Sequence, residues 1–173
     1  MSTIERIQAA LPGVALASLP ARDGTPAVRV AMADARAVIE ALRDACGFET
    51  NTFVTAVDLF PAEPRFDVAW QFLSYRHNER VRVRAFASGD AAKAPSIVDL
   101  YPGTGYSERE CYDMFGIVFE GHTGLKRLLM PEEYDHFPLR KDFPHQGIEP
   151  DRLYREWDRR RRERSPLPEE SAS

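Results

Sequence analysis

Cysteine is scarce in this sequence of 173 residues, and that limits the redox chemistry the chain can carry. Only Cys46 and Cys111 are present, and no CxxC motif occurs, so the chain lacks the four thiolates that an iron–sulfur cluster usually takes. Without a signal for export to an oxidising compartment, both thiols are expected to be reduced. Cys46 continues the apolar spacing of one predicted helix, and Cys111 lies on the apolar side of another, which predicts packing roles for both.

Long apolar runs and a secretory leader are also missing. No stretch approaches the roughly 18 to 20 apolar residues that a membrane span needs. Residues 1–13 lack the basic start, apolar block and cleavage site of a secretory signal. The formal net charge of −4 gives the chain as a whole no electrostatic case for binding nucleic acid. We therefore expect a cytoplasmic protein, or one that binds a membrane only through a partner.

Motifs of common active sites are absent as well. The sequence contains no HExxH, GxGxxG, GxxxxGK[ST] or GxSxG motif. It therefore has no sequence signature of a metalloprotease, a dinucleotide-binding protein, a P-loop NTPase or a serine hydrolase. The four histidines, which have no metal-ligand spacing, are His77, His122, His136 and His145. Glu108, Glu110 and Asp113 are carboxylates of the kind used in acid–base catalysis. Nearby basic residues balance their charge, which favours ion pairs within the chain or across an interface.

Residues 1–100 have the local patterns of an α+β domain. Apolar spacing and turn residues predict helices at 3–11 and 35–45, and strands at 27–32, 53–60, 65–75 and 79–87. Ser2 and Glu5 have the spacing of a capping box, and Asp34 is predicted to cap the second helix. The predicted fold is a mixed β-sheet with helices packed on one face, followed by an extended irregular C-terminal arm.

The last two predicted strands alternate in polarity, which assigns a core face to each. The core face of the first would be Phe66, Val68, Trp70 and Phe72. In the second, Val81, Val83 and Ala85 would face the core, and Arg80, Arg82 and Arg84 would face water. No aromatic platform accompanies these arginines, so nucleic-acid binding is not expected.

The composition changes after Asp99. Residues 101–146 are rich in proline, glycine and charge, and only one helix is convincing there. Ser107 and Glu110 match a capping box, so this helix is predicted to begin at Ser107, with an ion pair between Arg109 and Asp113. The rest is predicted to be an irregular arm that either wanders or has its backbone held by a partner. Residues 147–173 are predicted to form an Arg-rich helix and then a disordered end.

Three segments resemble a known family when they are taken in order. They read ERECYDMFGIVFEGH at 108–122, LKRLLMPEEY at 125–134 and FPLRKDFP at 137–144. This order is similar to the 30-kDa subunit family of respiratory complex I, which is also called the C subunit of NADH-quinone oxidoreductase. The resemblance covers roughly residues 1–146. The chain departs from the family pattern at Tyr134 and Phe137, where tryptophan and histidine are common.

The resemblance implies a scaffold rather than a catalyst. Family members carry no catalytic residue, metal or cofactor, and FMN, iron–sulfur clusters and quinone are bound by other subunits. The implied partners are the large 49-kDa subunit (the D subunit) and its neighbours in the peripheral arm, on the cytoplasmic side of the inner (plasma) membrane. The implied partner-binding residues are Glu108, Arg109, Glu110, Tyr112, Asp113, Met114, Phe115, Gly116, His122, Arg127, Pro138, Leu139, Arg140, Lys141 and Asp142.

Specific roles follow from this hypothesis. Glu108 and Glu110 would orient the start of the helix and pair with basic groups. The apolar anchors on the partner would be Tyr112, Met114 and Phe115. Arg140, Lys141 and Asp142 would form a charged clasp on the neighbour, so that Arg140→Ala should weaken assembly and leave the N-terminal domain folded.

Three alternatives stay open at the level of sequence. The chain could be the equivalent subunit of a related membrane-bound hydrogenase or formate hydrogenlyase, because other subunits decide the electron donor. It could be a free-standing soluble enzyme with a site at Cys111 or His122. It could also be a binding module unrelated to respiration.

Overall fold

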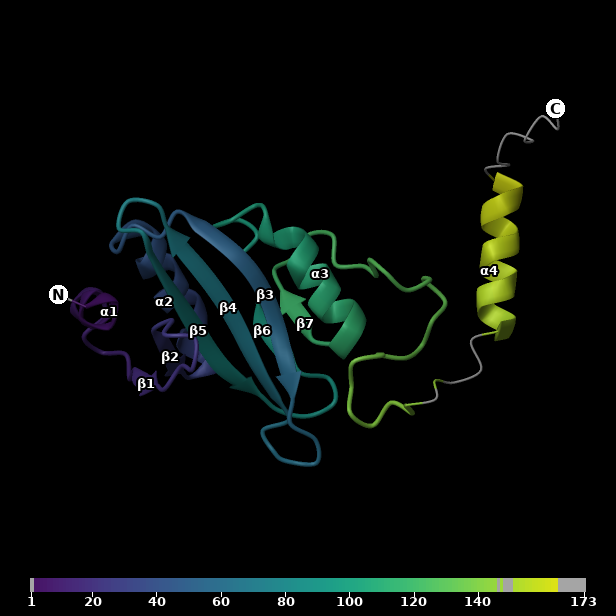
Figure 1. Ribbon diagram of the computed structural model, residues 1–173, viewed down its shortest axis with the longest axis horizontal. Helices are drawn as coiled ribbons and strands as arrows, with labels where there is room; N and C mark the ends of the chain where they lie inside the picture. Colours follow the sequence, from purple (N-terminus) through teal and green to yellow (C-terminus); the bar gives the residue numbers. More distant parts are fainter. Residues whose placement is uncertain (1, 146, 148–150, 165–173) are drawn as a thin grey trace.

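A mixed β-sheet forms the centre of the computed structural model, which describes residues 2–145, 147 and 151–164. Within these residues the sheet has five strands, in the order β1 (Ala17–Leu19), β2 (Ala27–Val30), β5 (Glu79–Ala87), β4 (Phe66–Ser74) and β3 (Thr50–Asp58) (Figure 1). β2 and β5 run parallel, and the other neighbours are antiparallel. A small parallel pair joins β6 (Lys93–Pro95) and β7 (Val118–Glu120).

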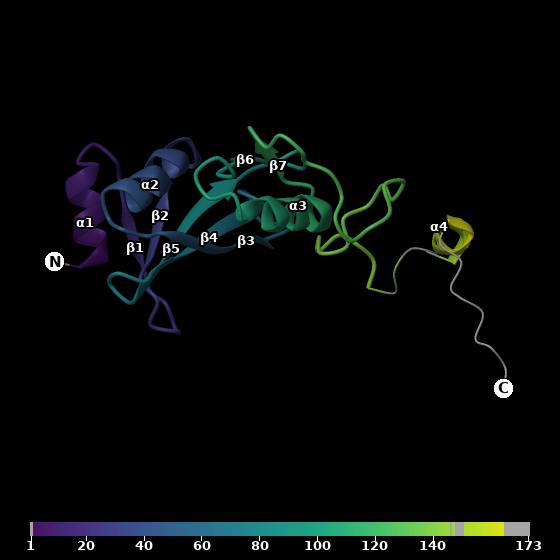
Figure 2. The same ribbon diagram turned by 90° about the horizontal axis from the view of Figure 1, so that it is seen from above.

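The helices that pack on this sheet lie on one side of it. α2 (Met32–Asp44) and α3 (Thr104–Phe115) cover one face together with the β6–β7 pair, and α1 (Thr3–Ala10) packs beside α2 (Figure 2). α4 (Asp151–Arg164) stands apart, beyond a segment of turns. The predicted α+β class, with a mixed sheet and helices on one face, is therefore confirmed.

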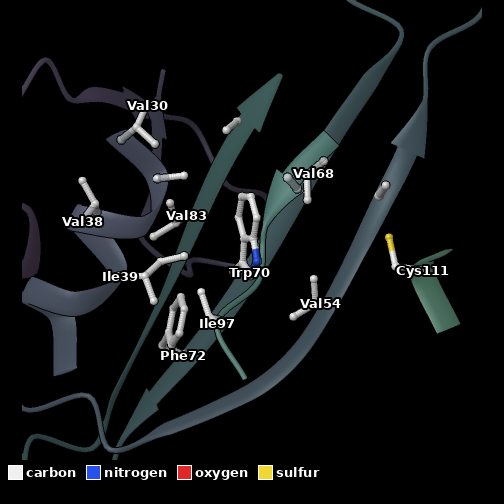
Figure 3. Close-up of a cluster of buried hydrophobic side chains, with 14 of the residues drawn as sticks. Val30, Val38, Ile39, Val54, Val68, Trp70, Phe72, Val83, Ile97 and Cys111 are labelled. Carbon is white, nitrogen blue, oxygen red and sulfur yellow. The ribbon is translucent and has the colours of Figure 1, made fainter. Parts of the chain in front are cut away.

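The core fills the space between the sheet and these helices. The predicted core residues of β4 and β5 are buried, and Figure 3 shows side chains from α2, β3, β4, β5 and α3 in this cluster. Cys46 and Cys111 are both buried there as free thiols. The cluster contains residues from both sides of position 100, and β6 pairs with β7 across it. A domain boundary at residue 100 stays a prediction.

Two helix ends test the predicted caps. At α1, Ser2 accepts from the Glu5 N–H and the Glu5 carboxylate accepts from the Ser2 N–H, as predicted. The prediction for Asp34 is wrong: α2 begins at Met32 with Ala31 as N-cap, and Asp34 lies in its first turn. There a carboxylate faces the positive end of the helix dipole without capping it.

The β5 arginines alternate with the buried Val81, Val83 and Ala85 as predicted, but Arg82 and Arg84 are half-buried rather than fully in water. Asp67 is buried on the same side of the sheet, and Arg84 and Arg29 both pair with it, at 2.6 and 2.7 Å. A buried carboxylate needs such partners, and this draws the arginines onto the sheet.

α4 lies where the sequence predicts an Arg-rich helix, and the end predicted to be disordered lies outside the described residues. None of the helices in the described part of the chain combines the length and the apolar character that a membrane crossing requires.

Candidate functional site

The residues that matched the family pattern lie on α3 and on the chain that follows it, and we call residues 104–145 the signature segment. α3 begins at Thr104, three residues before the predicted start. The capping box of Ser107 and Glu110 is wrong, because Ser107 lies inside the helix and donates to the Thr104 carbonyl at 3.0 Å. The chain enters the helix instead through a turn in which the Thr104 N–H and hydroxyl both donate to the Tyr101 carbonyl.

Asp113 organises the loop that follows β7. Its carboxylate accepts from the backbone N–H groups of Leu128, Leu129 and Met130 at 3.0, 2.7 and 2.9 Å. The Arg127 guanidinium donates to it at 2.7 Å. Burial alone would raise the pKa of Asp113, but these donors outweigh burial and hold the pKa below its usual range. We call this arrangement the Asp113 hub.

The predicted ion pair between Arg109 and Asp113 is wrong. Arg109 turns toward the same loop and donates to the carbonyls of Lys126 and Arg127, at 3.2 and 2.8 Å. Asp113 is taken up by Arg127, fourteen residues along the chain. Arg109 and Asp113, one turn apart on the same face of α3, thus both fasten one loop instead of pairing with each other, which a rule based on helix spacing alone does not anticipate.

The C-terminal end of α3 is capped by the PLRKD turn, residues 138–142. The Leu139 N–H donates to the Met114 carbonyl at 3.1 Å, and the Arg140 Nε donates to the Phe115 carbonyl at 2.6 Å. These bonds satisfy carbonyls that a helix end leaves open, and the guanidinium faces the negative end of the helix dipole. The turn therefore acts as a helix cap built from a distant part of the chain.

Gly116 makes this cap possible. Its φ of 76° is left-handed, and it is the C-cap that ends α3. A Cβ at this position would lie 2.6 Å from Arg140 Nη2 and 2.7 Å from the Phe137 ring. The backbone thus needs glycine both for its conformation and for the approach of Arg140 and Phe137.

A second buried carboxylate, Asp58, fixes the other side of the turn. Arg65 donates to it through Nε and Nη2, and the Lys141 N–H donates to it at 2.8 Å. Arg65 also pairs with Asp142 at 2.8 Å. Burial would raise the pKa of Asp58, but its bonds to Arg65 and Lys141 lower it overall. We call this arrangement the Asp58 hub.

The two hubs bear on the predicted roles of the signature residues. The guanidinium of Arg140 and the carboxylate of Asp142 are already paired within the chain. The expectation that the arm's buried backbone depends on a partner's hydrogen bonds is wrong for the amides of residues 128–130, 139 and 141, which donate within the chain. A clasp on a neighbour by these groups stays a prediction.

Glu108 differs from its predicted role. It is fully buried, and its carboxyl accepts from the Ser96 hydroxyl at 2.6 Å and from the Ile97 N–H at 2.8 Å. Both hydrogen-bond partners are neutral groups. The prediction that the Glu108 carboxylate pairs with basic side chains is therefore wrong for these two bonds. Burial raises the pKa of Glu108 despite them. The side chain fixes the β6–α3 connection.

The alternative enzymatic site at Cys111 and His122 finds little support. Cys111 is buried in the core, and burial raises the pKa of its thiol, which disfavours the nucleophilic thiolate. His122 is half-buried, lies 3.2 Å from the Gly105 carbonyl and accepts from the Gly124 N–H at 3.0 Å. Within the described residues, no group of three histidines, cysteines or carboxylates is placed to hold a metal ion.

The predicted partner-binding residues fall into three classes of exposure. The buried ones are Glu108, Asp113, Met114, Phe115 and Gly116. The half-buried ones are Arg109, Tyr112, His122, Arg127, Pro138 and Arg140. The exposed ones are Glu110, Leu139, Lys141 and Asp142. Four of the fifteen line a hollow of about 670 Å³ together with Phe143, namely Pro138, Leu139, Arg140 and Lys141.

Sequence reasoning named Leu139 as a partner-binding residue but missed three other exposed apolar side chains near the hubs. Val57, Phe60, Leu129 and Leu139 expose 47%, 44%, 62% and 55% of their surface. Phe60 and Lys141 both donate backbone N–H groups to Asp58, which brings Phe60 close to the PLRKD turn. Val57 precedes Asp58 directly, and Leu129 sits on the Asp113 hub. The one feature of the sequence that could have indicated these side chains is that each is an apolar residue close to a charged residue of a hub.

Comparisons with known proteins agree on a family. The family model described as respiratory-chain NADH dehydrogenase, 30 Kd subunit, matches residues 28–149. The chain is 43% identical over 146 residues to the C subunit of an NADH-quinone oxidoreductase from Rhodopseudomonas palustris, covering 83% of this chain and 72% of that one. It is 46% identical over 115 residues to the C subunit from Sinorhizobium medicae, covering 65% of this chain and 56% of the relative. The chain thus spans little more than half of some relatives.

A longer relative also matches. Over 105 residues the chain is 50% identical to the second C/D subunit of NADH-quinone oxidoreductase from Aquifex aeolicus, covering 58% of this chain and 18% of that protein. Most of that relative therefore has no counterpart here.

Solved structures share the fold. A trypsin-resistant fragment of Nqo5 superposes with a TM-score of 0.61 at 26% identity, covering 72% of this chain and all of the fragment. A chain of the membrane-bound sulfane sulfur reductase, an archaeal respiratory membrane complex, superposes with a TM-score of 0.71 over 98% of this chain and 93% of its own. Its identity of 20% shows the fold alone. With a family model matched over residues 28–149, this chain belongs to the 30-kDa subunit family of respiratory-chain NADH dehydrogenases.

Proposed function

We propose that this chain is a non-catalytic subunit of a proton-translocating NADH:quinone oxidoreductase, and that it binds the large 49-kDa subunit in the peripheral arm. The observation that carries the proposal is the apolar surface around the two hubs. Phe60 and Leu129 face water on backbone whose N–H groups donate to buried Asp58 and Asp113. Leu139 is exposed on the turn that bonds to the end of α3, and Val57 is exposed on β3 next to Asp58. Exposed apolar side chains on a rigid frame are suited to a protein partner, because little ordering entropy is lost on binding.

The 49-kDa subunit is the proposed partner because of a relative's name. The protein from Aquifex aeolicus is named for the C and D subunits together, and the part that matches this chain is 18% of it. Two functions carried by one polypeptide keep their domains at a high effective concentration, which suits parts that bind each other. FMN, iron–sulfur clusters and quinone would be bound by other subunits. The chain would sit on the cytoplasmic side of the inner (plasma) membrane and reach it through its neighbours.

The test is co-purification of the tagged full chain from gently solubilised membranes of its native cells. The test variant is Phe60→Asp with Leu139→Asp, which places charge in the apolar surface. The matched control is Tyr75→Asp, because Tyr75 is an exposed aromatic residue in the β4–β5 turn. β4 separates that turn from the Asp58 hub by about 27 Å.

We expect the wild type and the control to retain the 49-kDa subunit and NADH:quinone activity, and the double variant to lose at least about tenfold in retained subunits. Unchanged melting temperatures of the isolated variants would show that folding is not the cause. Equal retention by all three chains would reject this surface. If hydrogenase or sulfur-reductase subunits co-purify with the wild type, the proposed scaffold role stands, and NADH is replaced as the proposed electron donor.

A further inference from the structure

A row of arginines lies on one face of α4. Arg155, Arg159 and Arg162 are spaced i, i+4 and i+7, so they share a side of the helix and span about 10 Å along its axis. Arg159 and Arg162 expose 70% and 78% of their side chains. The three line one shallow hollow together with Asp158 and Glu163. We call this row the arginine stripe.

We propose that the arginine stripe binds a carboxylate-rich surface on a second protein chain. This contact goes beyond the proposed function, because α4 begins after residue 149, where the match to the family ends. It would therefore add a docking contact that the family match does not account for.

Carboxylates are the groups that arginines of α4 already bind. Arg160 lies 3.3 Å from the carboxylate of Glu133, which is outside the helix. Within the helix, Arg162 pairs with Asp158 at 3.0 Å, and Arg159 lies 3.9 Å from Glu163, too far for a hydrogen bond. A guanidinium has five N–H donors in a planar fork that fits a carboxylate. Exposed Arg159 and Arg162 thus keep donors for a further partner.

The flanking charges favour protein over lipid or nucleic acid. Asp158 and Glu163 border the stripe, and they would repel a row of phosphates. A helix that lies in a membrane surface inserts a broad apolar face, but Trp157 is half-buried and carries the Arg161 guanidinium 5.6 Å from its ring centre. A partner surface with acidic groups opposite the arginines and a basic group opposite Asp158 or Glu163 would match both signs.

The experiment uses the full chain, tagged, in its native cells. Arg159→Glu with Arg162→Glu reverses the stripe. Arg159→Lys with Arg162→Lys keeps its charge and adds primary amines to a chain whose own lysines are Lys93, Lys126 and Lys141. Arg76→Glu with Arg80→Glu is the control, since both arginines are exposed near the β4–β5 turn.

Two readouts are taken from each strain. The first is the amount of partner subunits retained on the tagged chain as salt rises from about 0.05 to 0.5 M, where screening weakens surface charge pairs. The second is zero-length carbodiimide crosslinking in the crude membrane extract. It activates a partner's carboxyl group, which then forms an amide with the introduced amine and releases the carbodiimide as a urea.

We expect the charge-reversed chain to retain about tenfold less partner at intermediate salt than the wild type, the lysine variant and the control. The lysine at position 159 or 162 should form an amide with an aspartate or glutamate of another polypeptide. Equal retention by all variants with no such amide would overturn the proposal. Binding to phosphatidylglycerol vesicles or duplex DNA that depends on the stripe, without an amide to protein, would also overturn it.

The two proposals fail separately. Loss of respiratory subunits from the wild-type chain itself would reject the proposed function. The amide crosslink from the lysine at position 159 or 162 is measured in the crude extract, before any complex is purified. Its presence or absence therefore tests the arginine stripe even if the proposed function is rejected.

Discussion

At the scale of single residues, the carboxylate of Asp113 holds three consecutive backbone N–H groups and Arg127. Asp113→Asn keeps the size but removes the charge and turns an NH2 group toward donors. We expect it to destabilise the chain by about 3 kcal/mol, since buried hydrogen bonds to a charged group are worth about 1.5 to 3 kcal/mol each. Urea unfolding at neutral pH measures this difference.

The same substitution has a definite pH dependence. Because the pKa of Asp113 is lower in the folded chain, its contribution is present above the ordinary aspartate pKa of about 4 and is lost as pH falls through the folded value. The gap in unfolding free energy between wild type and Asp113→Asn should therefore be constant from pH 6 to 8 and shrink below about pH 4. A gap independent of pH down to unfolding would mean that packing, rather than charge, holds the loop.

Gly116 tests whether space or conformation limits the helix cap. Gly89 has nearly the same φ, 75° against 76°, but a Cβ there would meet nothing within 4 Å. Gly89→Ala should cost about 1 kcal/mol for the left-handed backbone alone. Gly116→Ala should cost at least twice as much, because Arg140 and Phe137 must move. If thermal unfolding shows equal losses of stability for the two variants, Arg140 and Phe137 can move aside at no measurable cost.

At the scale of elements, the PLRKD turn determines how α3 ends. Arg140 donates to the Phe115 and Asp90 carbonyls, each at 2.6 Å, while the side chain of Lys141 is exposed. We expect Arg140→Ala to lower stability by about 2 to 4 kcal/mol, and Lys141→Ala to change it by less than about 0.5 kcal/mol. The first loss corresponds to a fall in melting temperature of roughly 4 to 16 °C for a chain of this size.

This expectation revises the role that the sequence suggests for Arg140. Lower yield of the assembled complex with Arg140→Ala would not by itself identify an interface, because the chain is also destabilised. Hydrogen exchange of the last turn of α3 distinguishes the two effects in the isolated chain. Faster exchange in Arg140→Ala would confirm that Arg140 caps the helix. Unchanged exchange would support the original prediction that Arg140 binds a partner.

The elements differ in how far sequence can predict them. The burial of β5 alternates with period two, so its core face follows from neighbouring residues, whereas β4 is buried on both faces from Phe66 to Trp70. The start of α3 depends on the Tyr101–Thr104 turn, whose sequence signal is weaker than the capping box at Ser107. The Asp58 hub joins Arg65 with Asp142, 77 positions apart, and no local pattern relates them. Local rules therefore predict four of the five strands of the sheet, and they miss β1 and the contacts that shape the candidate site.

At the scale of the whole molecule, the question is whether the signature segment folds before it meets a partner. Its loops contain few regular elements, which from sequence alone suggested that a partner must hold them. The structure instead provides internal acceptors for the amides of Leu128, Leu129, Met130, Leu139 and Lys141. A frame held from within would already present the apolar surface of the hubs to a partner.

Hydrogen exchange on the isolated full chain tests this directly. We expect peptides that contain the amides of residues 128–130 and 139–141 to exchange at least about a hundredfold slower than an unstructured chain, because these amides are bonded to buried or half-buried acceptors. In Asp113→Asn, protection should fall at 128–130 while it persists at 139–141, since the Asp58 hub is separate. Fast exchange of both stretches in the wild type would mean that they order only on binding. The affinity of the apolar surface would then be reduced by the cost of ordering two loops, and the variants at Phe60 and Leu139 would act on a coupled folding step rather than on a preformed surface.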